Sequence, residues 1–239
     1  MKGLIVAIGF LTRLPTPRLS VSDADFAASM RWFPAVGLIV GALVAAAGWG
    51  GARIDPWVGA LAALLAWIAV TGALHLDGLG DIADAAGAAH KERDRLRTVL
   101  ADPHVGSFAV VAIVLQLLAK LVLLHALVGG DGFVAIALVP FAARIGPLFW
   151  SRGLPDLHAG LGARFRGAVR PVDLAVWTLL LAGAAIWSPS LLCTPIVLIL
   201  WGWWLRRRIG GISGDSHGAG IEVSESLLLL AALVAMHPA

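Results

Sequence analysis

The sequence predicts an all-α fold, a polytopic membrane helix bundle of about seven transmembrane helices with interfacial helices on the cytoplasmic side. Hydrophobic residues make up 59% of the 239 residues, charged residues only 14%, and the mean hydropathy is +0.87. Soluble domains carry about 25% charged residues. The chain is long enough for about seven spans of roughly 20 residues with their loops. We therefore expect one integral-membrane domain, residues 1–239, without a separate soluble domain.

The first 34 residues predict structure at the membrane surface. Residues 4–11 are apolar but too short to span a bilayer, so we expect an interfacial or partly re-entrant segment. Residues 20–31 are polar and predict a short surface helix. The aromatic pair and proline at Trp32-Phe33-Pro34 then mark the membrane interface, where the first long apolar run begins.

Long apolar runs predict the transmembrane spans, and short connections join most of them. The two longer connections, 77–107 and 151–173, carry most of the polar residues. The predicted spans are 34–52, 57–76, 108–128, 133–150, 174–188, 190–205 and 220–237.

Basic residues predict the orientation of these spans. Fifteen lysines and arginines fall on one side of the seven-span arrangement, Arg53 alone falls on the other, and Lys120 and Arg144 lie inside spans. Because positive residues collect on the cytoplasmic side, we expect the N-terminus and the loops 77–107, 151–173 and 206–219 to be cytoplasmic. The C-terminus is then expected outside.

Three aspartates directly after the second apolar run form the most informative pattern in the chain. Asp77, Asp81 and Asp84 stand at i, i+4 and i+7. On a helix they fall within about 60° of arc and share one face. Carboxylates grouped at the edge of a span require a cation or a proton. Most other acidic residues fall on the same side as the basic residues, a mixture that suits a metal ion and a polyphosphate, although solvated loop charges are an alternative.

Other polar features leave alternatives open. Asp102 lies beside a Pro/Gly turn that either closes on a ligand or only introduces the next helix. The glycine-rich stretch 210–220 either lets its amides approach a phosphate or forms a flexible hinge. Glu222 opens the last apolar run, and Arg144, inside a span, must pair with either an acidic side chain or substrate. We expect His75 and Asp77 to form a hydrogen-bonded pair rather than a zinc site.

Four segments suggest a family. They occur in the order Phe10-Leu11-Thr12-Arg13-Leu14-Pro15-Thr16-Pro17, Thr71-Gly72-Ala73-Leu74-His75-Leu76-Asp77-Gly78-Leu79-Gly80-Asp81-Ile82-Ala83-Asp84, Asp102-Pro103-His104-Val105-Gly106-Ser107 and Gly210-Gly211-Ile212-Ser213-Gly214-Asp215-x-x-Gly218-Ala219-x-Ile221-Glu222-x-x-Glu225. Together they resemble the bacterial cobalamin synthase (adenosylcobinamide-GDP ribazoletransferase) family, from about residue 9 to 230. The chain departs from the usual family pattern at Ala85, His104, Ser213 and His217.

The resemblance implies a Mg²⁺-dependent enzyme of late cobalamin biosynthesis. Such an enzyme transfers the cobinamide-phosphate group of adenosylcobinamide-GDP onto α-ribazole or α-ribazole 5′-phosphate and releases GMP. The implied location is the bacterial inner membrane, with the active site on the cytoplasmic side, lipid as a partner and no nucleic acid. The spans are rich in small residues, which also suits a homo-oligomer.

The resemblance also implies the site residues. By motif position, Mg²⁺ binding falls to Asp77, Asp81 and Asp84. The further catalytic residues, with roles in metal binding, base catalysis or substrate orientation, are Asp102, Asp215 and Glu222. The expected substrate-binding residues are His75, Arg13, Arg93, Arg144, Gly106 and Gly214.

Two other classes of protein compete with this interpretation. A cation- or proton-coupled transporter would place acids near the bilayer midplane and show paired repeats, and we find no internal repeat. A CDP-alcohol phosphotransferase performs similar chemistry. The signature of that family begins like Asp81-x-x-Asp84 but is not completed in this chain.

Overall fold

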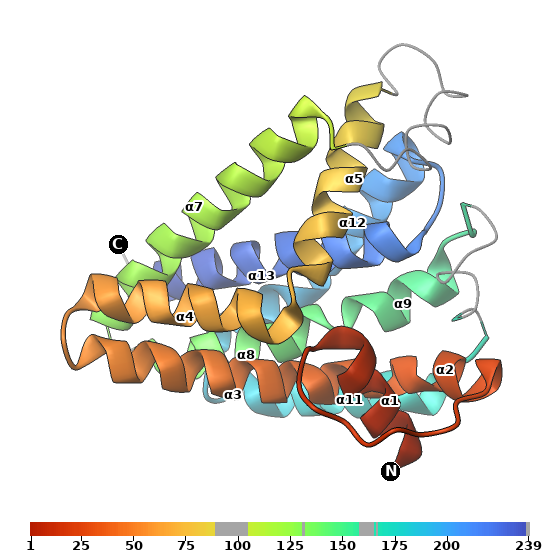
Figure 1. Cartoon of the computed structure of the whole chain (residues 1–239), viewed down its shortest axis with the longest axis horizontal. Helices are drawn as coiled ribbons and strands as arrows, with labels where there is room; N and C mark the ends of the chain where they lie inside the picture. The colour runs from red at the N-terminus through yellow and green to blue at the C-terminus, as the bar shows by residue number, and fades with distance from the viewer. Residues whose placement is uncertain (89–104, 131, 158–164, 166, 238–239) are drawn as a thin grey trace.

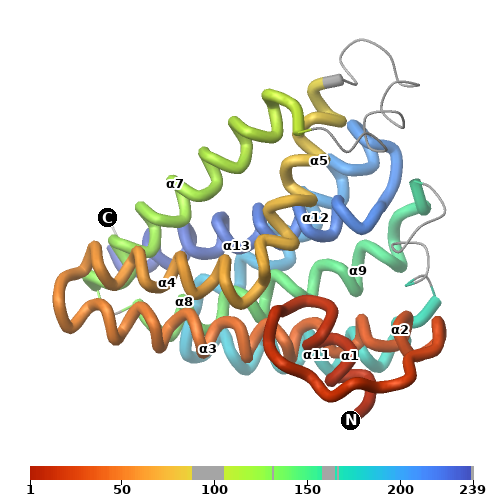
Figure 2. The backbone as a smooth tube through the Cα atoms, in the orientation of Figure 1, coloured from red at the N-terminus to blue at the C-terminus, as the bar shows by residue number. Residues whose placement is uncertain are grey.

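A computed structural model of the chain describes residues 1–88, 105–130, 132–157, 165 and 167–237 (Figures 1 and 2). Within these residues the fold is helical and contains no strand, which confirms the predicted all-α class. The α-helices are α1 (Lys2–Leu11), α2 (Asp23–Ser29), α3 (Phe33–Ala52), α4 (Pro56–Thr71), α5 (Leu74–Ala88), α7 (Ser107–Gly129), α8 (Phe133–Ala143), α9 (Gly146–Gly153), α11 (Pro171–Ala184), α12 (Thr194–Arg208) and α13 (Gly214–Met236). Two 3₁₀ turns, η1 (Met30–Trp32) and η2 (Pro189–Cys193), precede α3 and α12.

The helices run between two ends of an elongated bundle. Figure 1 shows the turn between α3 and α4 and the C-terminus at the left-hand end, while α2 and the tip of α5 lie toward the right. At the first end, Trp57 of α4 stacks on His125 of α7 with ring centroids 3.7 Å apart. At the other end, Arg31 donates a hydrogen bond to the carbonyl of Ala168 at 2.6 Å. The connections that the sequence predicts on opposite sides of the membrane are thus also separated in space.

Five helical stretches are long and apolar enough to cross a membrane among the described residues: Asp23–Ala52, Ser107–Gly129, Phe133–Gly153, Pro189–Arg208 and Gly214–Met236. The pair α4 and α5 would make a sixth crossing, but its two helices are bent by 85°. The helix α11 is apolar, but with 14 residues it is shorter than these five stretches. The structure therefore supports a multi-pass membrane protein, and the count of seven spans stays a prediction.

The predicted span 57–76 is wrong in one respect, because α4 ends at Thr71 instead of continuing to residue 76. Gly72 adopts φ 62° and Ala73 adopts φ 58°, the left-handed region that ends an α-helix. The next helix, α5, starts at Leu74 and contains the three aspartates predicted to be helical. The break thus sends the acidic helix in a new direction instead of extending the apolar one.

The surface helix predicted between residues 20 and 31 is confirmed as α2. Ser22 and Asp25 form a reciprocal capping box at its start. Lys2 of α1 reaches the Asp25 carboxylate at 2.6 Å and joins the two short helices. Together α1 and α2 lie beside the start of α3 (Figure 2).

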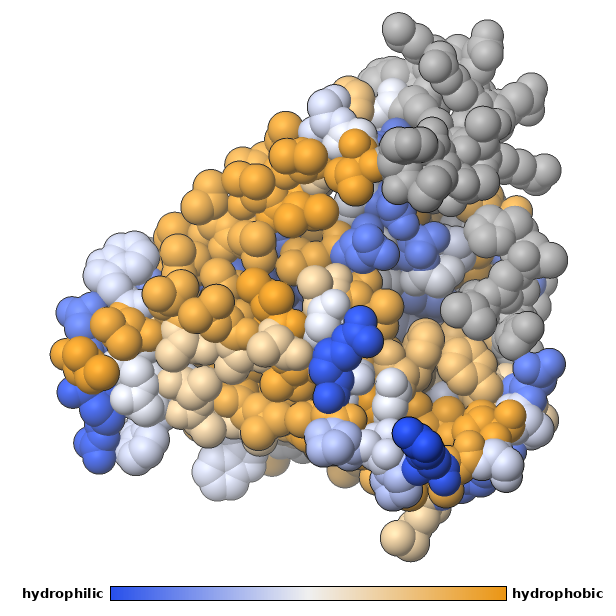
Figure 3. Space-filling view, in the orientation of Figure 1, coloured by the Kyte–Doolittle hydropathy of each residue, from blue (hydrophilic) through white to orange (hydrophobic). Residues whose placement is uncertain are grey.

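The outer surface of α7 is apolar. Figure 3 shows hydrophobic side chains over α7, whereas hydrophilic side chains gather beside α5. The exposed side chains of α7 include Val110, Val111, Val114, Leu115, Leu118 and Val122. A continuous apolar face of this kind matches contact with lipid.

A buried group of charges joins three of the long helices. Lys120 of α7 contacts Glu222 at 2.7 Å and Glu225 at 2.6 Å, both on α13. Arg144, after α8, contacts the other oxygen of Glu225 at 2.8 Å. Gln116 donates to the Glu222 carboxylate at 2.9 Å. Two positive and two negative charges therefore compensate one another, and of the two partners that the sequence left open for Arg144, the structure supplies the acidic one.

Removing one charge from this group should destabilise the fold. We expect Lys120→Met to lower the free energy of unfolding by about 3–5 kcal/mol, because Glu222 and Glu225 would lose their shared cation in the interior. Adding Glu222→Gln should recover part of that loss, since the remaining Arg144–Glu225 pair is balanced. Thermal or denaturant unfolding in detergent micelles measures both variants. Lys2→Met, at the exposed pair with Asp25, is the control and should change little. Equal stability of Lys120→Met and wild type would contradict the structural role.

Candidate active site

The acidic helix α5 begins at a break that the N-terminal segment covers. The backbone N–H of Arg13 donates to the carbonyl of Val70 at 2.7 Å. The side chain of Arg13 lies against Gly72, where a Cβ would overlap the guanidinium stem. Glycine at this position therefore provides both the left-handed turn and the space for Arg13. Arg13, predicted to bind substrate, is exposed at the base of α5.

The helices α5 and α13 approach each other closely at two glycines. A Cβ on Gly78 would lie 2.7 Å from the carbonyl oxygen of Asp215. A Cβ on Gly218 would lie 3.3 Å from the Cα of His75. This close contact brings Asp77 of α5 and Asp215 of α13 to the same cavity.

That cavity has a volume of about 130 Å³ and combines ionisable and aromatic walls. The aromatic rings of Phe10, Phe33 and Phe165 pack on one another, with the centroids of Phe33 and Phe165 5.6 Å apart. The residues that line the cavity are Phe10, Leu11, Phe33, Leu74, His75, Asp77, Phe165, Gly214, Asp215, His217, Gly218 and Ile221. Acidic groups and apolar rings thus face the same small space.

Four carboxylates gather around this end of α5. The negative charges of Asp215, Asp77 and Asp84 all act on Asp81. These carboxylates offer oxygen atoms, the ligand type that Mg²⁺ prefers. In the part of the chain that the structure describes, no three His, Cys, Asp or Glu side chains converge closely enough to hold a metal ion by themselves. Mg²⁺ commonly takes only one or two protein carboxylates and completes its shell with water and substrate phosphates, so this donor set fits such an ion.

Asp84 has a structural role that the sequence did not indicate. One of its carboxylate oxygens accepts the backbone N–H of Gly106 at 2.7 Å, and the other accepts that of Ala109 at 3.0 Å. Gly106 is the residue before α7, so Asp84 caps the N-terminus of that helix and ties it to α5. A Cβ on Gly106 would overlap the Asp84 carboxylate, which explains the glycine there.

Two histidines of the cavity are deeply buried. His75 is 2% exposed, and its Nδ1 atom lies 3.4 Å from Nη2 of Arg144. The expected pair of His75 with Asp77 is therefore replaced by a contact with Arg144. His217 is 5% exposed, and its Nε2 atom lies 3.3 Å from the hydroxyl of Ser151. In the sequence, His217 stood out only as a departure from the family pattern.

The remaining predicted site residues divide into three groups. Gly214 opens α13 and lines the cavity, so the glycine-rich stretch is helical from that residue onward instead of a loop. Glu222 and Arg144 lie in the buried charge group, away from the cavity wall. Asp102 and Arg93 lie outside the described residues. Sequence reasoning missed Lys120, whose position as a charge inside an apolar run was the available signal.

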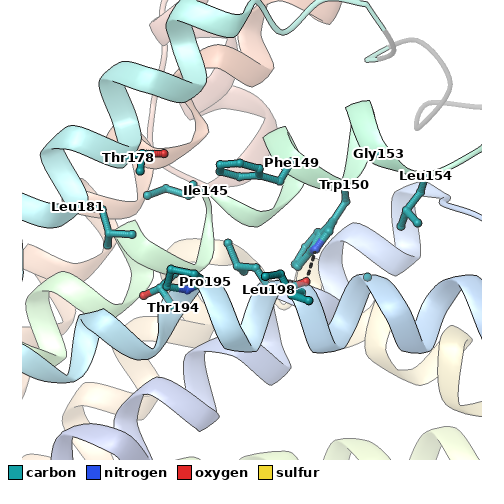
Figure 4. Close-up of a pocket in the computed structure, with 12 residues that line it drawn as sticks. Ile145, Phe149, Trp150, Gly153, Leu154, Thr178, Leu181, Thr194, Pro195 and Leu198 are labelled. Atoms are coloured by element: carbon teal, nitrogen blue, oxygen red, sulfur yellow. Dashed lines mark hydrogen bonds between the residues drawn. The ribbon is translucent and has the colours of Figure 1, made fainter.

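A second cavity, of about 380 Å³, lies between α9, α11 and α12 (Figure 4). Its lining contains no ionisable side chain, and the indole N–H of Trp150 beside it donates to the carbonyl of Leu198 at 2.9 Å. This cavity therefore offers no ionisable group to a ligand, unlike the cavity of Asp77 and Asp215.

Comparisons with known proteins identify the family of the chain. The model of a family described as cobalamin-5-phosphate synthase matches residues 3–233. Three relatives carry the name adenosylcobinamide-GDP ribazoletransferase. The protein from Novosphingobium aromaticivorans is 63% identical over 98% of this chain and 97% of its own length. Those from Laribacter hongkongensis (54% identical, 98% of both chains) and Thiobacillus denitrificans (49% identical, 99% and 96%) are also similar throughout.

No solved structure matches the chain. The family match over nearly all of its length and the full-length relatives show that the chain belongs to the cobalamin-5-phosphate synthase family.

Proposed function

We propose that this protein is an adenosylcobinamide-GDP ribazoletransferase acting late in the assembly of the cobalamin nucleotide loop. It transfers the cobinamide-phosphate group of adenosylcobinamide-GDP onto α-ribazole or its 5′-phosphate and releases GMP. The observation that carries this proposal is the cavity at which Asp77 and Asp215 meet, in a chain of this family. The names of the full-length relatives support the same reaction.

The reaction needs a positioned hydroxyl and a base. A ribazole hydroxyl oxygen attacks the phosphorus linked to cobinamide, a new P–O bond forms, and the bond to the departing GMP oxygen breaks. The hydroxyl proton passes to a base, a role that we assign to Asp215 in the first turn of α13. Phosphoryl transfer leaves little covalent chemistry to the protein, so positioning and charge stabilisation supply most of the rate.

The carboxylates of α5 fit a Mg²⁺ cofactor. We assign Asp77, which lines the cavity, and Asp81, one turn further along α5, as the residues that would hold it. When bound, Mg²⁺ would neutralise the diphosphate and the negative charge that develops on the leaving GMP. Asp84 already accepts two backbone amides, so we assign it to anchoring α7. The spacing alone, with Asp81 and Asp84 three residues apart, favours these two over Asp77 as joint ligands, but the two amide contacts of Asp84 support Asp77 in its place.

The two competing functions receive less support. A CDP-alcohol phosphotransferase would be expected to match a different family along the chain, and the match extends over residues 3–233. A transporter would use its intramembrane acids as ion carriers, yet Glu222 and Glu225 are already paired with Lys120 and Arg144.

We further propose that the protein resides in the bacterial inner membrane with the acidic end of α5 on the cytoplasmic side. The apolar surface of α7 supports contact with the bilayer. The positive residues of the sequence support the orientation. No nucleic acid is involved, and small-residue-rich spans suit association of copies.

A direct assay tests the proposed reaction. Purified protein in lipid vesicles, supplied with Mg²⁺, adenosylcobinamide-GDP and α-ribazole 5′-phosphate, should release GMP and form the cobalamin phosphate. The same mixture with EDTA should lose the activity. Absence of GMP in the presence of Mg²⁺ and folded protein, with either ribazole or its phosphate, would refute the proposal.

The three acidic positions of α5 should separate into two groups. We expect Asp77→Asn and Asp81→Asn to lower kcat by about 10²-fold or more with unchanged stability, because each removes a charge from the cation's surroundings. Asp84→Asn should instead lower the free energy of unfolding by about 1–3 kcal/mol, since it weakens two bonds to the start of α7. GMP release and thermal unfolding are measured for each variant.

Gly106→Ala is the matched control for this comparison, because its Cβ would displace the same Asp84 carboxylate without removing a charge. It should resemble Asp84→Asn. An Asp84→Asn protein of wild-type stability that requires far more Mg²⁺ would place Asp84 at the metal instead.

Single cysteines should report the orientation. In a Cys193→Ser background, Arg53→Cys, at the exposed turn between α3 and α4, should react with an impermeant maleimide added to spheroplasts. Ser20→Cys, exposed before α2, should react only after the membrane is permeabilised. Reaction of both residues from the outside would contradict the proposed orientation.

A further inference from the structure

His75 occupies an unusual position between the charged interior and the cavity. It belongs to the first turn of α5 and lines the cavity together with Asp77 and Asp215. Its ring is 2% exposed, and only its Nδ1 atom has a polar neighbour among the described residues. The other ring nitrogen, Nε2, is buried without a hydrogen-bond partner in that part of the chain. Any polar contact between this ring and a molecule in the cavity must therefore use Nε2.

The neighbour of Nδ1 fixes where the ring carries its hydrogen. Nη2 of Arg144 lies 3.4 Å from Nδ1, and a guanidinium nitrogen can only donate. Nδ1 must therefore accept, and it cannot carry a hydrogen of its own. The hydrogen of the imidazole is left on Nε2. His75 thus offers a hydrogen-bond donor, and no acceptor, to the cavity.

The buried charge group holds Arg144 in the position that this contact requires. Nη1 of Arg144 donates to Glu225 at 2.8 Å and to the carbonyl of Pro140 at 3.0 Å. Glu225 is held in turn by Lys120 at 2.6 Å. With Nη1 fixed by two acceptors, the planar guanidinium has its Nη2 edge directed at His75.

We propose that His75 donates a hydrogen bond from Nε2 to a negatively charged phosphate oxygen of the substrate, and that Arg144 is the positioning residue that fixes this tautomer. The inference rests on the proposed function, since it assigns the phosphoryl group as the occupant of the cavity. A donor is the complementary partner for a phosphate oxygen in a cavity whose other ionisable residues include the carboxylates of Asp77 and Asp215. The same geometry excludes His75 as a base and as a metal ligand through Nε2, because both roles need a free electron pair there.

Isosteric variants separate these roles. In glutamine the side-chain amide nitrogen occupies nearly the place of Nε2 and donates, but it is neither a base nor an imidazole ligand. We expect His75→Ala to lower kcat by about 10²-fold or more, and His75→Gln to stay within about 10-fold of wild type. His125→Gln, at the opposite end of the bundle and stacked on Trp57, is the control and should retain full activity. Equal loss in His75→Gln and His75→Ala, or full activity in His75→Ala, would overturn the proposal.

A measurement on the wild-type protein makes the inference independent of variant folding. Nitrogen-15 NMR of histidine-labelled protein in lipid nanodiscs, assigned by comparison with His75→Gln, should show a hydrogen on Nε2 of His75 and none on Nδ1. Arg144→Lys keeps a cation for Glu225 but loses the second arm of the fork, so His75 should then populate both tautomers. A hydrogen on Nδ1 in the wild-type protein would overturn the proposal.

Adding adenosylcobinamide-GDP tests whether the tautomer of His75 and the binding of substrate are connected. Its addition should shift the Nε2 resonance of His75 in the wild-type protein, and no shift would overturn the donor role. Wild-type protein that gives the expected tautomer but releases no GMP would refute the proposed function and the phosphate donor with it. Wild-type GMP release combined with equally inactive His75→Gln and His75→Ala would refute the donor alone.

Discussion

The described fold depends on compensating two buried cations with two buried carboxylates. A membrane interior cannot hold an isolated Lys120 or Arg144, so Glu222 and Glu225 must lie beside them, and this requirement fixes α7, α8 and α13 relative to one another. The contact of Arg144 with His75 extends the same group to α5. The buried charge group therefore helps to position α5, although its own members do not line the cavity.

Close packing of helix backbones also fixes the helices relative to one another. Gly37 and Gly41 let α3 approach the carbonyls of Pro140 and Ala137 on α8. Gly78 and Gly218 let α5 approach α13. At each of these glycines two helix backbones lie in direct contact, with no side chain between them. The carboxylates where α5 crosses α13 are therefore held by helices and not by loops. Such a scaffold suits phosphoryl transfer, in which geometry supplies much of the catalysis.

Local patterns in the sequence predicted the helices, but not which helices contact one another. The apolar runs predicted most of the long helices, and the spacing of Asp77, Asp81 and Asp84 predicted a shared helix. The second role of Asp84 could not be predicted, because its amide partners follow 22 and 25 residues later and periodicity says nothing of which helices meet. The partner of Arg144 was undecided for the same reason. The early end of α4 had a signal in Gly72, but an apolar run tolerates glycine, and only the packing of Arg13 shows that the helix must turn there.

The short helices have a consequence for the surrounding lipid. With 16 and 14 residues, α4 and α11 rise only about 24 and 21 Å, less than the hydrocarbon thickness of about 30 Å. If each of them crosses the membrane by itself, the bilayer must thin locally around it to relieve the hydrophobic mismatch. The polar end of the bundle would then lie below the average plane of the headgroups. A substrate from the water could then reach the carboxylates of α5 in such a depression without crossing the lipid.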